Sequence, residues 1–112
     1  MSREVFTVIL AANFKKNVDQ GWSILIECME KPWKHGSVYR GRWRVFCLSP
    51  DKEEKPILVM RKNIEPRIFL SAHGVIAFLE EMGVDMAVAP MVEGQKVAVN
   101  KDLQVELVGD DE

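Results

Sequence analysis

The sequence predicts an α+β domain in which a curved antiparallel β-sheet has one amphipathic helix, at about residues 71–82, packed across it. Three observations support this fold class. Polar and apolar residues alternate from Val38 to Leu48, as in a strand with one face in water. Apolar residues recur at helical spacing after Ser71. Elsewhere, short segments rich in β-branched and aromatic residues alternate with turn-forming residues.

The chain of 112 residues has the length of one domain, which we assign to residues 1–108, followed by an acidic tail at 109–112. Its 47% hydrophobic and 29% charged residues are typical of globular proteins. It contains no apolar run of the ~20 residues that a membrane span needs, and no secretory signal pattern. Cys28 and Cys47 are far apart within apolar segments, so we expect buried, reduced thiols. We therefore expect a cytoplasmic protein without membrane contact.

The N-terminal part contains two predicted strands. Residues 5–12 suit a buried strand, and residues 22–29 form the second one. A helix remains an alternative for the first segment, because five apolar residues recur at helical spacing after a cap at Ser2: Phe6, Ile9, Leu10, Phe14 and Val18. Residues 13–21 are polar and turn-forming. Lys31-Pro32 and His35-Gly36 are expected to break the chain before the strand at 38–48.

The predicted helix lies between two further sets of strands. Residues 49–56 form a polar connection, 57–61 a buried strand, 63–66 a turn and 67–70 a short apolar segment. Ser71 is a good N-cap and Gly83 fits a left-handed C-cap, with this apolar stripe between them: Ala72, Val75, Ile76, Leu79 and Met82. Residues 86–89 suit a strand ended by Pro90, and residues 96–99 and 103–108 suit a hairpin around 100–102.

The alternation within residues 38–48 places three arginines on one face of the strand. Arg40, Arg42 and Arg44 are two apart, which spaces them by about 7 Å in an extended chain. The opposite face holds a mostly apolar set: Tyr39, Trp43, Val45 and Cys47. The row of guanidinium groups suits a polyanion, whereas an ordinary solvated sheet face gives the same pattern.

Charge is segregated along the chain, although the net charge is only −2. Residues 31–67 carry 10 basic and 4 acidic side chains, and residues 68–112 carry 2 and 9. Such segregation creates local potentials that steer charged partners. The acidic tail at 109–112 is expected to be solvated; the alternative is that it covers the basic face.

The segment Arg40-Gly41-Arg42-Trp43-Arg44-Val45, a polar connection and the strand-to-helix stretch at 68–78 together resemble the repeat of Pur-type proteins. The positive-cofactor-four and Whirly families share this sheet-then-helix plan. The similarity spans about residues 38–83, with Ser71 where Pur repeats favour proline. The resemblance implies binding of single-stranded DNA or RNA on the sheet, in most of these proteins as a homodimer. It also implies that residues 40–44 form the binding strand.

We therefore predict a non-enzymatic protein that binds single-stranded nucleic acid, with cations for phosphates and rings for bases. Trp43 faces away from Arg42 in a regular strand, so it suits the core better than base stacking unless a bulge at Gly41 changes the register. Phe46 shares the arginine face, and Trp33 is the best exposed aromatic candidate. The candidate binding residues are Arg40, Arg42, Arg44, Trp33, Trp43, Phe46, Lys31, Lys34, Arg61 and Lys62.

Catalytic chemistry has little support in the sequence. His35 and His73 are the only near-neutral bases, and no hydrolase elbow, phosphate loop or zinc motif is present. We predict no catalytic residue, metal or cofactor. The alternative function is a protein-interaction module whose arginine strand pairs with acidic groups of a partner or of its own dimer mate. Two features distinguish the hypotheses: acidic neighbours of the arginines, and an exposed aromatic side chain beside them.

Overall fold

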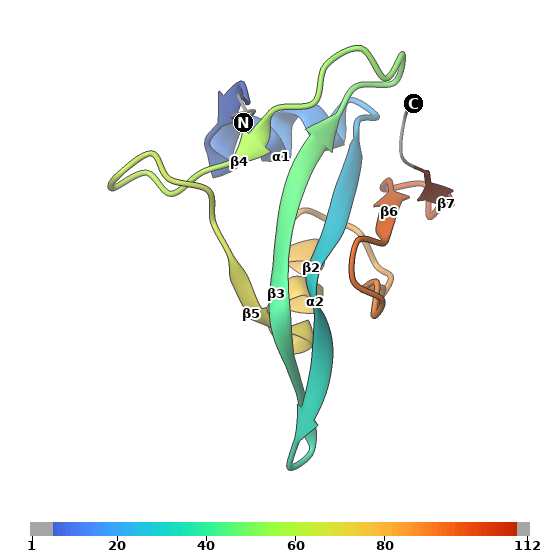
Figure 1. Ribbon diagram of the computed structural model, residues 1–112. Coiled ribbons are helices and arrows are strands. Elements are labelled where there is room, and N and C mark those ends of the chain that lie inside the picture. The colour runs from blue at the N-terminus through green and yellow to red at the C-terminus, as the bar shows by residue number, and fades with distance from the viewer. Residues whose placement is uncertain (1–5, 110–112) are drawn as a thin grey trace.

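The computed structural model describes residues 6–109, which form one curled, mixed β-sheet with two helices (Figure 1). The strands are β1 (Val8–Ile9), β2 (Ser23–His35), β3 (Val38–Leu48), β4 (Ile57–Leu58), β5 (Phe69–Ser71), β6 (Lys96–Val99) and β7 (Val105–Val108). Their order is β1-β4-β3-β2-β6-β7, and β5 also pairs with β3. The pairing of β1 with β4 is parallel and the other pairings are antiparallel, so the α+β class is correct but the purely antiparallel sheet is not.

The predicted helix is present as α2 (Ala72–Glu81), and a second helix, α1 (Ala11–Asp19), covers part of the N-terminal segment for which the sequence left a helix as the alternative. The Ser71 Oγ accepts a hydrogen bond from the Gly74 backbone N–H at 3.1 Å, as the capping prediction requires. The N-terminal segment combines both alternatives, since a two-residue strand leads into a helix that buries Phe14 and Val18. Leu10 is the N-cap of α1 and provides no side-chain cap bond. Ser2 lies outside the described residues, as does the acidic tail after Gly109.

The main core lies between the helices and one face of the sheet. It joins Phe14 of α1 and Phe78 of α2 to Trp43 and Val45 of β3. A smaller apolar cluster lies around Leu25 and Phe46, whose side chains alternate with those of the main core and therefore point to the opposite face.

The connection from α2 to β6 contains no strand, so the strand expected at 86–89 is wrong. Met86, Val88 and Ala89 instead pack against the main core from a loop. This loop is bound to β3, because the Trp43 Nε1–H donates a hydrogen bond to the Pro90 carbonyl at 2.8 Å.

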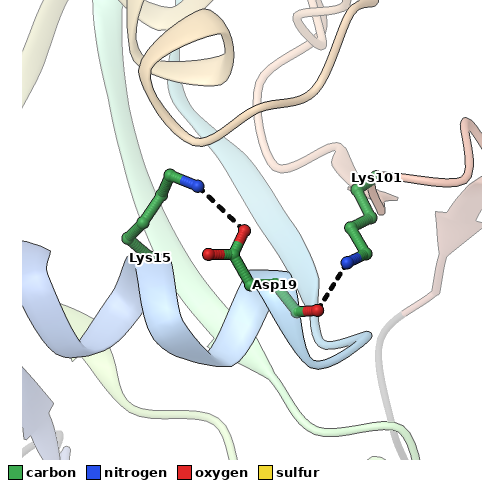
Figure 2. A network of polar contacts seen from close by, with 3 residues as sticks. All are labelled: Lys15, Asp19 and Lys101. Carbon is green, nitrogen blue, oxygen red and sulfur yellow. Dashed lines mark hydrogen bonds and ion pairs between the residues drawn. The ribbon is translucent and has the colours of Figure 1, made fainter.

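The predicted C-terminal hairpin is present as β6 and β7, and its turn contacts α1. Lys101 donates from Nζ to the backbone carbonyl of Asp19 at the end of α1, and the Asp19 carboxylate accepts from Lys15 Nζ at 2.8 Å (Figure 2). A cation near the C-terminus of a helix satisfies its open carbonyls and its dipole. The contact therefore joins the C-terminus of α1 to the turn between β6 and β7.

The hairpin of β2 and β3 is the longest element of the protein. β3 has the predicted bounds, but β2 continues through the break expected at Lys31-Pro32. It turns at Gly36 and Ser37, where Gly36 has a φ of +67° that suits the first position of a tight hairpin turn. The hairpin extends past the rest of the sheet as a two-stranded arm (Figure 1). We define the arm as residues 29–42; at its root β5 adds a third strand, where Ser71 pairs with Arg40.

Candidate nucleic-acid interface on the hairpin arm

The predicted alternation along β3 is correct. Trp43 and Val45 lie in the core beside the helices, whereas Arg40, Arg42 and Arg44 lie on the other face. The three arginines nevertheless have three different environments, which follow the hairpin from its base to its tip.

Arg44, at the base, has a structural role. Its Nε donates to the Glu27 carboxylate at 2.6 Å, and only 14% of its side chain is exposed. Its guanidinium also lies 5.1 Å from the centroid of the Phe6 ring and 5.3 Å from that of Phe46. Because a charge-assisted bond and two rings already hold this group, the expectation that Arg44 contacts nucleic acid has to be corrected.

Neither of the two aromatic candidates on β3 has a ring available for stacking. Trp43 is 0% exposed, because the core and the loop at Pro90 enclose it. Phe46 is on the arginine face, as predicted, but it is buried by an edge-to-face contact with Phe6 at 5.4 Å. Trp43 and Phe46 are therefore core residues. The register does shift around Gly41 in the pairing of β3 with β5, and two further shifts lie in β2, but none of them exposes the Trp43 ring.

Arg42, in the middle, makes a loose ion pair. Its Nε lies 3.5 Å from a carboxylate oxygen of Glu30, and both side chains are about half exposed. Exposed pairs with this geometry contribute little to stability, typically below about 1 kcal/mol. Arg42 therefore remains available to a ligand, although Glu30 reduces the positive potential around it.

Arg40, towards the tip, has no ion pair within residues 6–109 and is exposed. Its cross-strand neighbour is Trp33, whose side chain is 51% exposed. Cross-strand neighbours project from the same face of a sheet. An exposed aromatic ring therefore lies beside an exposed cation, as the nucleic-acid hypothesis requires.

Two bulges in β2 create these cross-strand pairs. The register shifts between Cys28 and Glu30 and again between Glu30 and Trp33. Each shift adds a residue to β2, so side chains beyond it change face. Without the shifts, Arg40 would face Lys31, a pair of like charges. Pro32 is tolerated here because β6 pairs with β2 only from Ile24 to Glu27, and no other strand within residues 6–109 continues that edge.

A shallow pocket of about 260 Å³ lies at the root of the arm. It spans three strands and is lined by Glu30, Trp33, Arg40, Gly41, Arg42 and Leu70. Leu70 of β5 and the role of Glu30 were not expected from the sequence. A two-residue hairpin turn at Gly36-Ser37 places Trp33 directly across from Arg40, so the sequence alone could have predicted this cross-strand pair.

The remaining lysines of the arm strengthen its positive charge. Lys31 and Lys34 are exposed, and residues 31–40 contain no acidic side chain. Lys34 lies opposite Tyr39, which is also exposed and gives the other face of the arm an aromatic ring that the prediction missed.

Arg61 and Lys62 do not extend this surface. They are exposed on the connection between β4 and β5, which projects away from the tip of the arm (Figure 1). Arg61 instead lines a separate groove with Ala11 of α1 and Arg67. Arg61 and Lys62, two of the predicted binding residues, therefore lie apart from the candidate interface on the arm.

Both cysteines are buried and free, as predicted. Burial raises the pKa of the Cys47 thiol to about 12 and also raises the pKa of Cys28. Protonated, enclosed thiols are poor nucleophiles. On the remote 49–56 connection, hydrogen bonds from the Ser49 hydroxyl and the Glu53 backbone N–H lower the pKa of the Asp51 carboxyl.

No protein-family model, curated protein or solved structure matches this chain. The similarity to Pur-type repeats therefore stays a prediction. Across residues 6–109, neither helix has the length and apolar character needed to cross a bilayer.

Proposed function

We propose that this protein binds single-stranded nucleic acid, without catalysis, through the hairpin arm. One observation supports this most directly: the exposed Trp33 ring lies beside Arg40, which has no acidic partner among residues 6–109. Sequence-tolerant binding of single strands combines cations for the backbone with aromatic rings for the bases. The arm supplies both, on a segment without acidic residues from 31 to 40.

The ring favours single strands over duplexes. Bases in a duplex already stack on one another, whereas an unpaired base is free to stack on Trp33. Such a contact is worth about 1–3 kcal/mol per base. The arm offers about three phosphates a cation each, from Lys31, Lys34 and Arg40. For three such contacts, a plot of the logarithm of the affinity against the logarithm of the salt concentration has a slope of roughly −2.

Fluorescence titration with a short single-stranded oligonucleotide tests the proposal. Trp43 is enclosed and Trp22 is partly buried against the core, so quenching by a stacked base reports mainly on the exposed Trp33. We expect saturable quenching at low salt that weakens with the slope above. Arg40→Ala and Trp33→Ala are expected to weaken binding, measured for both by fluorescence anisotropy of a labelled oligonucleotide.

The matched control is Arg61→Ala, which removes an exposed cation from the β4–β5 connection and leaves the arm intact. It is expected to bind like the unmodified protein. Equal losses in Arg40→Ala and Arg61→Ala would point to nonspecific attraction. Absence of any binding at low salt would refute the proposal.

A protein partner is the second candidate, and the ion pairs favour it. Glu27 and Glu30 already neutralise Arg44 and Arg42, which leaves a smaller basic surface than the sequence suggested. Val38, Tyr39 and Leu70 add exposed apolar area near the tip. If no oligonucleotide binds at low salt, this candidate becomes the better one.

A further inference from the structure

We propose that the pocket at the root of the arm accepts one nucleobase and prefers cytosine, with its exocyclic amino group, to uracil. The inference rests on the proposed function. It adds that the arm distinguishes bases rather than holding the backbone alone. Its basis is the juxtaposition of the Glu30 carboxylate and the Arg42 guanidinium between two exposed apolar surfaces.

The pocket has the size and lining for one planar ring. Its volume of about 260 Å³ is below the roughly 300–1,000 Å³ of sites for drug-sized ligands. Trp33 lies on the β2 side and Leu70, 57% exposed, on the β5 side. Arg42 lies on β3, between these two strands, and Glu30 is its cross-strand partner on β2. A base therefore meets apolar surface at its faces and polar groups at its edge.

The polar pair is open to a ligand. The Arg42–Glu30 distance is 3.5 Å, longer than the roughly 2.7–2.9 Å of a charge-assisted hydrogen bond. The pair of Arg44 and Glu27 shows what a closed pair looks like in the same hairpin, at 2.6 Å and largely buried. Glu30 thus retains acceptor capacity, and Arg42 retains donors.

Base chemistry then predicts the preference. An ionised carboxylate only accepts hydrogen bonds, and a guanidinium only donates them. Cytosine presents its N4 amino donor next to the N3 and O2 acceptors, so the donor meets Glu30 while the acceptors meet Arg42. Uracil presents a single N3–H between two carbonyl oxygens, and both oxygens are repelled by the carboxylate. The match is therefore better for cytosine.

The test compares oligo-dC with oligo-dU of equal length, which differ in the edge of the base and not in ring size or backbone. We expect the unmodified protein to bind oligo-dC roughly 5-fold more tightly, the lower end for an exposed contact. Glu30→Gln removes the negative charge and supplies an amide that both donates and accepts. We expect it to bind both oligonucleotides more tightly and to lose the preference.

The readout is the ratio of the affinities for oligo-dC and oligo-dU. Removal of an acidic side chain raises the affinity for both oligonucleotides alike, and this common increase does not change the ratio. Glu53→Gln removes an exposed acid on the 49–56 connection and is the control that should keep the preference. Equal affinity of the unmodified protein for both oligonucleotides, or an unchanged ratio in Glu30→Gln, would overturn the base pocket while leaving the proposed function intact. Failure of both oligonucleotides to bind at low salt would overturn the proposed function itself.

Discussion

Replacement of Trp43 by phenylalanine tests whether the enclosed indole joins the 84–95 loop to the sheet. The side chain is 0% exposed, and its Nε1–H donates to the buried Pro90 carbonyl at 2.8 Å. Phenylalanine preserves the aromatic character of the site but has no N–H. The substitution therefore removes the hydrogen bond and part of the packing volume together.

The two losses add to about 2–4 kcal/mol. A buried carbonyl left without its donor costs about 1–3 kcal/mol. The smaller ring adds roughly 1 kcal/mol, since removing a whole tryptophan or phenylalanine side chain from a core costs about 3–5 kcal/mol. A domain of this size is stable by about 5–15 kcal/mol, so the variant is expected to fold with a markedly lower free energy of unfolding.

Urea unfolding followed by far-UV circular dichroism measures the loss without depending on tryptophan emission. We expect the midpoint to fall while the slope stays constant, since the surface exposed on unfolding hardly changes. Trp33→Phe is the control, because that ring is exposed on the arm, and its effect should stay within about 0.5 kcal/mol. Equal free energies of unfolding for the two variants would refute the assigned role of Trp43.

Three further predictions concern the hairpin and the core. Arg44→Ala is expected to lower the free energy of unfolding by about 1.5–3 kcal/mol, because it removes the arginine that pairs with the largely buried Glu27 carboxylate. Arg42→Ala is expected to lower it by less than about 1 kcal/mol, because its ion pair is exposed. Equal losses of the two variants in urea unfolding would contradict this difference. Burial raises the pKa of Cys47 to about 12, so between the ordinary thiol pKa and that value the folded state retains a proton that the unfolded chain releases. The free energy of unfolding should fall as pH rises through this range, by up to about 1.4 kcal/mol per pH unit, and Cys47→Ala should make the fall shallower in urea titrations at several pH values. Gly41→Ala would place a Cβ atom 3.0 Å from the Trp43 ring, so the melting temperature should drop; an unchanged value would show that the ring moves aside freely.

The sequence predicts the site only as far as strand alternation is regular. Each arginine of residues 38–48 lies on the predicted face, although the pairing of β3 with β5 shifts register between Arg40 and Trp43. In β2 the same reasoning fails, because two extra residues place Glu30 and Trp33 on the face that Met29 and Lys31 would otherwise share. The amino-acid composition of β2 gives no sign of the two bulges except Pro32, and the Lys31-Pro32 pair predicts the end of a strand instead.

Tertiary packing explains both the N-terminal segment, which the sequence left open between strand and helix, and the segment at 86–89, where the predicted strand is wrong. The helix α1 lacks a side-chain cap and contains Asn13 and Asn17, so its local preference is weak. Burial of Phe14 and Val18, one turn apart, stabilises it instead. The opposite happens at 86–89, where apolar residues that favour a strand are buried as a loop.

The strand order also determines when the sheet can be completed during synthesis. Ile24 pairs with Val99 and Ile26 with Val97, so one edge of β2 waits for β6, which the ribosome adds only after α2 and the loop that follows it. Until β6 emerges, the nascent hairpin has open backbone groups beside a buried-type apolar sequence, the kind of edge on which chains aggregate. A nascent chain stalled before Lys96 therefore presents an aggregation-prone edge, and the synthesis of β6 is the step that protects β2.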